Sequence, residues 1–159
     1  MMDDVRYCQQ WFRRYRKMIN PLSFEEAKRL HHAGCGYTAL LGPEQRPRAH
    51  VQMLLDKKVI LVGFLDEHVR EYLSYQFELM DGPRIFLSSA TFRSYPDSGD
   101  QVICGETYSF STSGEAVILE TDFDLNESRE LSKEYDPSSH FIEMPPFGSF
   151  ESLAKEDWL

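Results

Sequence analysis

The sequence predicts an α+β fold in which two N-terminal helices pack on an antiparallel β-meander of about six strands, with short C-terminal helices. Apolar residues recur at helical spacing in residues 3–33, whereas they alternate or run without interruption in residues 48–125. A chain of 159 residues with 42% hydrophobic content is long enough to bury one core. We therefore expect a single domain over residues 1–159, which ends in a C-terminal helix and tail at 126–159.

The first predicted helix spans residues 3–19 and is amphipathic. Its apolar stripe consists of Val5, Cys8, Phe12, Tyr15 and Ile19. Most of the basic side chains in this segment lie on the opposite side, which predicts one packed face and one solvated, basic face. The helix is expected to end at Asn20-Pro21, because proline interrupts helical hydrogen bonding.

A second helix is predicted from Ser23 to about His32. Ser23 and Glu26 have the spacing of a capping box, in which each side chain bonds the backbone N–H of the other residue. Gly34 and Gly36 follow the last helical residues, and glycine is common where helices end.

Six strands are predicted after the link 42-GPEQRPR-48. They are expected at 51–55, 59–65, 69–79, 84–92, 106–111 and 115–124. The run 59-VILVGFL-65 is apolar throughout, which is typical of a central strand that is buried on both faces. Asp81-Gly82-Pro83 and Ser113-Gly114 mark turns between neighbouring strands.

The last predicted strand has two chemically different faces. Its apolar face would carry Val117, Leu119, Thr121, Phe123 and Leu125. The opposite face would carry Ile118, Glu120, Asp122 and Asp124. Because side chains alternate along a strand, we expect these acids to form an exposed, ionised ladder on the solvent face.

The C-terminal part is expected to be short helices and an ordered tail. Asn126 is a suitable N-cap for a helix over residues 127–134, whose early acids favour the helix dipole. The tail would be ordered by packing of Phe141, Ile142 and Phe147. A final turn or two of helix would dock through Phe150, Leu153 and Trp158.

Charge is distributed unevenly along the chain. The formal net charge is −9, but residues 94–159 alone contain three basic and fifteen acidic side chains, a net −12. Such a field repels nucleic acid and attracts cationic partners. The N-terminal segment lacks the apolar core of a secretory signal, and no apolar run is long enough to span a bilayer, so we expect a cytoplasmic protein without a membrane partner. Cys8, Cys35 and Cys104 are expected to be thiols.

No metal, cofactor or catalytic residue is predicted. Asp122, Asp124 and Asn126 match the start of a calcium loop, but Glu127 and Lys133 occupy the positions that require glycine and a bidentate glutamate. The segment 31-HHAGC-35 lacks the second ligand pair of a zinc site.

A cysteine nucleophile is an open alternative. Cys35 could take His50, His68 or His140 as its base, since catalytic groups assemble from distant positions. The simpler interpretation of 31-HHAGC-35 is a helix C-terminus, with histidines near the last carbonyls and a small thiol that packs behind a glycine turn.

The segment 92-FRSYPDSGDQVICGETYSFSTSGEAVILETDFD-124 contains an aromatic-rich strand ending in FRSY, a polar link, and G-x-x-Y-x-F before a glycine turn and an aliphatic strand. It resembles the strand-turn-strand segment of small bacterial immunity proteins, which are encoded beside polymorphic or contact-dependent toxins. The resemblance covers about a fifth of the chain. It implies a non-enzymatic inhibitor that binds a cognate toxin protein and blocks its active site.

We therefore expect a toxin-binding surface that occludes a basic cleft. Its acidic members would be Glu120, Asp122, Asp124, Glu127 and Glu130. Tyr72 and Tyr95 would supply aromatic anchors, because a few buried contacts dominate affinity at most interfaces. The alternative for the acids is a solvated face that only keeps the protein soluble.

Two other functions remain open from the sequence. The first is a small enzyme or ligand-binding protein with a pocket between the helices and a curved sheet. His31, His50 or His68 would then line an interior cavity. The second is an adaptor whose acidic surface recruits a basic partner that is not a toxin.

Overall fold

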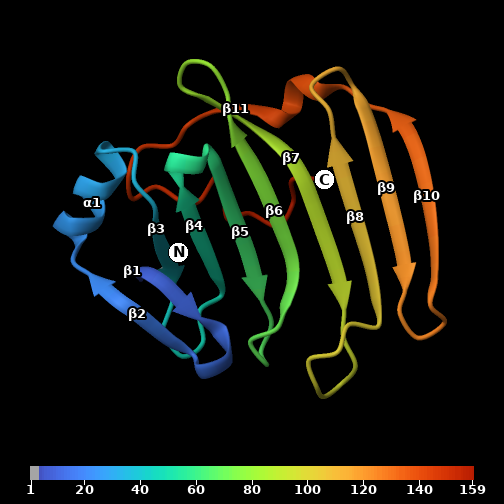
Figure 1. Ribbon diagram of the computed structural model, residues 1–159, viewed down its shortest axis with the longest axis horizontal. Coiled ribbons are helices and arrows are strands. Elements are labelled where there is room, and N and C mark those ends of the chain that lie inside the picture. Colours follow the sequence, from blue (N-terminus) through green and yellow to red (C-terminus); the bar gives the residue numbers. More distant parts are fainter. Residues whose placement is uncertain (1–3) are drawn as a thin grey trace.

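The computed structural model describes residues 4–159 and is dominated by one open antiparallel sheet (Figure 1). Within those residues it contains eleven strands and one α-helix, α1 (Phe24–His32). The strands are β1 (Val5–Phe12), β2 (Lys17–Leu22), β3 (Tyr37–Leu41), β4 (Ala49–Leu54), β5 (Val59–Leu65), β6 (Glu71–Leu79), β7 (Arg84–Ser94), β8 (Cys104–Phe110), β9 (Glu115–Asp122), β10 (Glu127–Glu134) and β11 (Phe141–Glu143). The predicted α+β class is therefore wrong.

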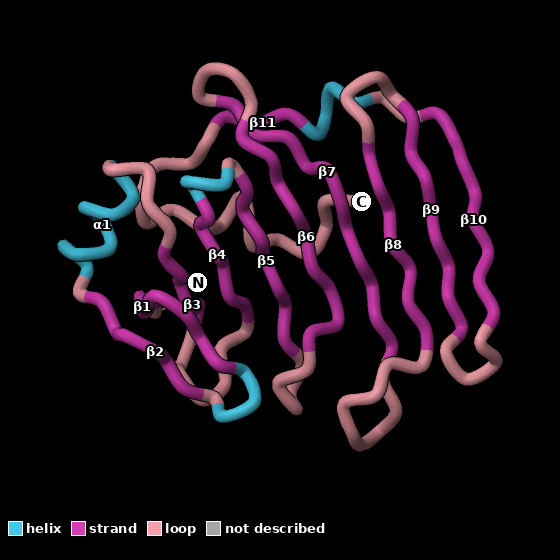
Figure 2. Tube along the Cα trace, viewed as in Figure 1, coloured by secondary structure: helices cyan, strands magenta, loops and turns pink. Residues whose placement is uncertain are grey.

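The sheet is a meander with one rearranged end. Its strand order is β10-β9-β8-β7-β6-β5-β4-β3-β1-β2, and β11 pairs with the free side of β7 near its start. Helix α1 connects the edge strand β2 back to β3 and lies at that end of the sheet (Figure 2). The opposite edge is β10, all of whose residues are exposed.

Cross-strand register defines two faces, because residues directly opposite one another in an antiparallel pair point to the same side. One row of partners is Val51, Val62, Tyr75, Ala90, Tyr108 and Ile118. We call this side the packed face. The neighbouring row is His50, Gly63, Ser74, Thr91 and Thr107, and we call its side the polar face.

The core lies on the packed face, under α1 and the C-terminal segment. Ala27 of α1 packs in one cluster with Tyr7 and Tyr37. The chain after β11 crosses behind the sheet from β4 towards β7 (Figure 1), where Leu153 is fully buried. The Trp158 ring lies 5.6 Å from the Phe77 ring, centroid to centroid. The tail thus completes the core of the central strands.

The predicted helix at 3–19 is wrong, and β1, a short 3₁₀ turn at Arg13–Tyr15 and β2 occupy that segment. Residue 3, its first position, lies outside the described residues. The alternation of Val5 and Tyr7 places both on the packed face, opposite Leu41 and Ala39 of β3. The hairpin turn closes through a left-handed Arg16 (φ 51°), a conformation that glycine usually supplies.

The second predicted helix is confirmed. Helix α1 begins after Ser23, whose hydroxyl accepts a hydrogen bond from the Glu26 N–H at 3.1 Å. The Glu26 carboxylate accepts one from the Ser23 N–H at the same distance, which completes the capping box.

The six predicted strands are confirmed as β4 to β9, with ends that differ by a few residues. Strand β3 was not predicted, although 37-YTALL-41 is apolar except for Thr38 and is buried at every residue. Its neighbours β1 and β4 cover both of its edges.

Two C-terminal predictions are wrong. Residues 127–134 form strand β10 rather than a helix, because they pair along their whole length with β9. Asn126 has φ 53° and makes the preceding turn instead of capping a helix. The segment after residue 149 consists of turns rather than a helix, although Phe150 and Leu153 do dock as expected.

The predicted faces of β9 are also exchanged. Ala116 and Ile118 are buried, whereas Leu119 is 44% exposed. Glu120 and Asp122 therefore share the packed face with buried residues, and both are half-buried rather than fully solvated. The acids reach solvent because the C-terminal segment does not extend as far as their end of the sheet.

Candidate functional site

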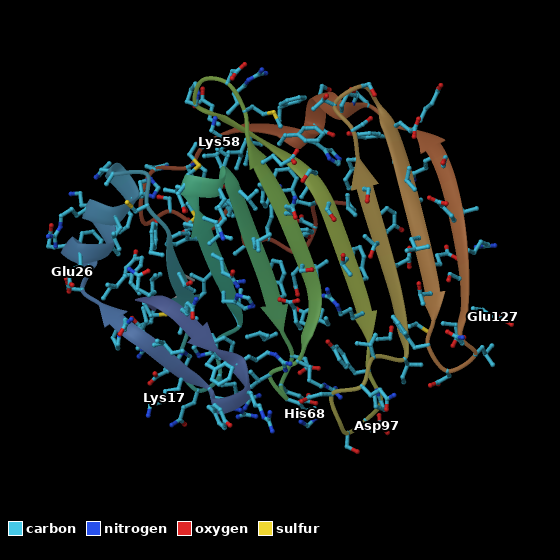
Figure 3. All side chains as sticks on the ribbon, viewed as in Figure 1. Lys17, Glu26, Lys58, His68, Asp97 and Glu127 are labelled. Atoms are coloured by element: carbon cyan, nitrogen blue, oxygen red, sulfur yellow. The ribbon has the colours of Figure 1, made fainter. Side chains whose placement is uncertain are left out.

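An open hollow of about 510 Å³ lies on the packed face at the β7–β10 end of the sheet. Its walls are Phe92, Ser94, Cys104, Gly105, Glu106, Glu120, Thr121, Asp122, Glu127, Ser128 and Arg129. We call it the acidic hollow. It forms because β8, β9 and β10 continue the sheet beyond the part that the C-terminal segment covers. Figure 3 shows Glu127 at the end of the sheet that lies farthest from Lys17.

Four carboxylates and one cation line the acidic hollow. Register places Glu106, Glu120 and Arg129 in one row, with Asp122 and Glu127 opposite each other in the next row. Arg129 Nη2 lies 2.8 Å from Glu120 Oε2, and the Arg129 side chain is more exposed than that of Glu120. Within residues 4–159 the other three carboxylates have no ion-pair partner, so the hollow has an excess of negative charge.

The pKa of Tyr108 is raised next to these carboxylates. The Tyr108 hydroxyl donates a hydrogen bond to the Glu106 carboxylate. That bond, together with burial and the charges of Glu106 and Glu120, raises the pKa of Tyr108 to about 12. A phenolate would add negative charge to a site that is already anionic, so the proton is retained.

The β9–β10 turn beside the hollow is held by Asp122. Its Oδ1 accepts hydrogen bonds from the N–H groups of Asp124 and Leu125, at 3.0 and 3.1 Å. The turn presents Phe123 and Leu125 to solvent, with exposed fractions of 55% and 66%. Apolar and acidic side chains therefore lie next to one another at this end of the molecule.

The structure brings together three of the five predicted acidic residues. Glu120, Asp122 and Glu127 all line the acidic hollow. Asp124 lies in the adjoining turn, and Glu130 points to the polar face, opposite Leu119. Sequence reasoning missed Glu106, which alternates with Tyr108 along β8 and could have been found from that alternation.

The two predicted aromatic anchors lie elsewhere and contact the protein itself. The Tyr72 hydroxyl donates a hydrogen bond to Glu156 of the C-terminal segment. The Tyr95 hydroxyl donates one to the Glu71 carbonyl at 2.6 Å, and the Arg70 guanidinium lies 4.9 Å from its ring centroid. Neither ring belongs to the acidic hollow.

A second polar cluster lies on the polar face. His50 Nε2 is 3.2 Å from Glu71 Oε1, and Arg93 Nη1 is 3.1 Å from Glu71 Oε2. The Ser74 hydroxyl accepts a hydrogen bond from Arg93 at 3.3 Å. Neither Glu71 nor Arg93 was predicted as a site residue. The one available signal was Gly63 within an apolar strand, since such a glycine often marks a close approach.

Among the described residues, the histidines lie apart from Cys35. His31 bonds the Tyr37 hydroxyl beside α1, and His140 bonds the Leu87 carbonyl. The side chain of His68 is 54% exposed in the β5–β6 turn. Cys35 Sγ lies 3.9 Å from the Ala33 carbonyl, and no histidine of residues 4–159 is within hydrogen-bonding distance of it.

Neither a metal-binding group of side chains nor a membrane-spanning helix is found in the described part of the chain. Among residues 4–159, no three His, Cys, Asp or Glu side chains are grouped so that they could hold a metal ion. In the same residues, no helix has the length and apolar character that crossing a bilayer requires. All three cysteines are free thiols.

Comparison with known proteins gives no relative. No protein-family model matches the chain, and no curated protein or solved structure matches it either.

Proposed function

We propose that this protein is a non-enzymatic inhibitor that binds a basic protein through the acidic hollow, in the manner of bacterial immunity proteins. The observation that carries the proposal is the hollow itself, where four carboxylates face solvent with one cation among them. The toxin class of the partner rests on the resemblance of residues 92–124 to immunity proteins.

Electrostatics favours a basic partner. Residues 94–159 have a net charge of −12, and they contain the strands β8, β9 and β10 that form most of the hollow. Complementary charge raises association rates by orders of magnitude when it converges on one surface. In a basic cleft, the carboxylates would occupy the positions that phosphate groups of a substrate take.

The neighbouring apolar side chains supply the contacts that charge alone does not. Leu131, opposite Ile118 on the packed face, and Leu125 in the adjoining turn are both exposed at the β9–β10 end of the sheet. Aromatic and aliphatic groups that become buried usually dominate the affinity of an interface, whereas charges set its rate and orientation. Leu125 and Leu131 therefore replace Tyr72 and Tyr95 as the apolar anchors that we favour, because the Phe123 ring lies on the polar face beside Gly105.

Strand β10 is protected against pairing with a second copy of itself. An exposed edge strand is a template for sheet extension unless charge opposes it. Its sequence 127-ESRELSKE-134 places a charged residue at five of eight positions. The partner is therefore expected on the acidic hollow and the adjoining turn rather than along the edge.

The test is a capture experiment with matched variants of the tagged full chain. In the hollow variant, Glu120→Gln, Asp122→Asn and Glu127→Gln remove three charges and keep side-chain shape. The control variant removes the same number of charges at exposed sites elsewhere, through Glu25→Gln, Glu67→Gln and Glu151→Gln. Each protein is incubated with lysate of its source cells and washed at low and at high salt.

We expect one stoichiometric basic protein that is retained by the wild type and the control variant, lost by the hollow variant, and released by high salt. Salt matters because exposed charges are screened beyond about 8 Å at physiological ionic strength. Equal retention by the hollow variant would remove the hollow from the interface. A basic partner without toxic activity would favour an adaptor over an inhibitor.

A further inference from the structure

Two adjoining hollows lie on the polar face, opposite the side that holds the acidic hollow. The larger, of about 750 Å³, is bounded by the β1–β2 hairpin, β3 and β4. The smaller, of about 290 Å³, lies over β4 to β7. Gln52 lines both, so the two hollows adjoin, and together we call them the polar groove.

Sheet register gives the groove its floor. Thr38, Gln52, Leu61, Gln76 and Ser89 are successive cross-strand partners from β3 to β7. The β1–β2 hairpin, which crosses in front of β3 in Figure 1, adds Gln9, Gln10 and Trp11 as a wall. The groove therefore runs across the strands and not along them.

The groove contains amide groups that the protein does not use. Within residues 4–159, the side chains of Gln9, Gln10, Gln52 and Gln76 make no hydrogen bond. Gln9, Gln52 and Gln76 are nevertheless half-buried, which removes part of their access to water. Each amide has a carbonyl acceptor and two N–H donors. A ligand that both donates and accepts hydrogen bonds would satisfy them.

The charged groups of the groove nearly balance one another. The only carboxylate of the smaller hollow, Glu71, bonds His50 at 3.2 Å and Arg93 at 3.1 Å. In the larger hollow, the two charged wall residues, Asp56 and Lys57, have opposite signs. The field along the floor is thus close to neutral, which disfavours phosphate or carboxylate ligands.

Trp11 contributes an apolar surface rather than a donor. Its indole N–H donates to the Glu44 carbonyl at 3.0 Å, so that group is occupied. The ring centroid lies 5.8 Å from the His50 ring centroid, where the two hollows approach each other. An aromatic wall beside uncharged amides suits a ligand that has C–H patches between its hydroxyl groups.

We propose that the polar groove binds a neutral oligosaccharide. Sugar hydroxyls donate and accept hydrogen bonds, as the glutamine amides require, and sugar C–H faces pack against aromatic rings. Two adjoining hollows match a chain of more than one sugar ring. An extended peptide is disfavoured, because peptides dock on a sheet by pairing with free backbone groups, and the floor strands are paired on both sides.

The test uses the full-length, ¹⁵N-labelled protein titrated separately with chitotetraose, cellotetraose and maltotetraose. The observed signals are the side-chain amides of Gln52 and Gln76 and the indole of Trp11. We expect saturable shifts of all three with at least one sugar. Gln52→Ala should weaken that binding about fivefold, the loss expected for one neutral hydrogen bond or two. Gln101→Ala, in the exposed β7–β8 loop, should bind as the wild type does.

A second variant and a second class of ligand serve as controls for this test. Gln76→Ala repeats it from a different strand, so failure of one variant to fold does not decide the outcome. A neutral tetrapeptide of serine and glutamine is titrated in parallel. No saturable shift with any of the three sugars overturns the proposal, as does tighter binding of the peptide. Sugar binding that neither glutamine substitution weakens also overturns it. These outcomes are independent of the proposed inhibitor function, which concerns the opposite face.

Discussion

His50 and Glu71 meet above Gly63, with the imidazole Nε2 and the carboxylate Oε1 3.2 Å apart. The two side chains come from β4 and β6; Gly63 of β5 is the register partner of His50, whereas Glu71 pairs with Leu65, beyond a register shift between Phe64 and Leu65. A Cβ atom at Gly63 would lie within 3.0 Å of both Glu71 Oε1 and His50 Nε2. The absence of a side chain on β5 is therefore what allows the contact across three strands.

Gly63→Ala is expected to break the His50–Glu71 contact and to lower the free energy of unfolding by about 1–2 kcal/mol. Both obstructing atoms are ends of side chains, which can turn aside, so the fold should survive. Denaturant unfolding measures the loss, and the ring ¹⁵N signals of His50 report the broken contact. Gly36→Ala is the control, since its added Cβ meets its nearest neighbour at an ordinary 3.5 Å. An unchanged His50 signal in Gly63→Ala would contradict the geometry.

The C-terminal segment is expected to stabilise the sheet as part of its core. Leu153 is fully buried, and its truncation to alanine should cost about 3 kcal/mol of unfolding free energy. Leu159 is 53% exposed, and Leu159→Ala should change stability by less than about 0.5 kcal/mol. Urea denaturation of both variants compares them directly. Equal, small effects would mean that the tail is not docked.

The capping box of α1 should contribute measurably to stability. Ser23→Ala removes the hydroxyl that accepts from the Glu26 N–H, and an N-cap of this kind is worth about 1 kcal/mol. Ser23→Asp keeps an acceptor at the same place and should retain most of that stability. Thermal unfolding followed by circular dichroism separates the two variants. The capping account fails if alanine and aspartate behave alike.

Acid should destabilise the protein through His31. Burial, assisted by the nearby charge of His32, lowers the pKa of His31 below its ordinary value of 6.5. The unfolded chain therefore takes up this proton at a higher pH than the folded chain does. The neutral His31 side chain therefore contributes its full share of the unfolding free energy above pH 6.5. That contribution declines as the pH falls from 6.5 towards the pKa of His31 in the folded state.

His31→Gln is expected to flatten the pH dependence of unfolding free energy between about pH 5 and 7. The glutamine amide can still accept from the Tyr37 hydroxyl, which lies 2.8 Å from His31 Nδ1 in the wild type. His68→Gln removes a histidine whose side chain is 54% exposed, and it is the matched control. If the pH slope flattens in His68→Gln but not in His31→Gln, the prediction that His31 causes the acid destabilisation is wrong.

The N-terminal hairpin shows why a helical pattern misled prediction. Val5, Cys8 and Phe12 fit a helical stripe, but Val5 and Tyr7 also fit strand alternation, and short segments satisfy both periods. The turn at Arg16 lacks the glycine that would have marked a hairpin. In the structure Phe12 is 46% exposed, so one member of the supposed apolar stripe is not buried.

Strand β10 could not be predicted from its own residues. The segment 127-ESRELSKE-134 has the charged composition of a solvated helix, and all of its residues are exposed. Its conformation comes from pairing with β9, a contact that local propensity does not encode. The central strands were predictable because their buried positions require apolar residues, which form continuous or alternating apolar patterns such as 59-VILVGFL-65.

The candidate site was partly predictable for the same reason. Glu120, Asp122 and Glu127 stood out as acids in an acidic third of the chain. Their position on one face follows from the pairing of β8, β9 and β10, which their own sequences do not reveal. Their exposure follows from the position of the C-terminal segment, which does not cover them. The polar groove requires the β1–β2 hairpin, so a sequence interpretation with a helix there could not contain it.

Growth of cells that produce the captured partner tests the central claim most directly. The partner is expressed alone, with the wild-type protein, with the hollow variant, or with the control variant that lacks three remote charges. We expect arrest with the partner alone, protection by the wild type and the control, and little protection by the hollow variant at equal protein levels. Full protection by the hollow variant, or normal growth with the partner alone, would contradict inhibition through the acidic hollow.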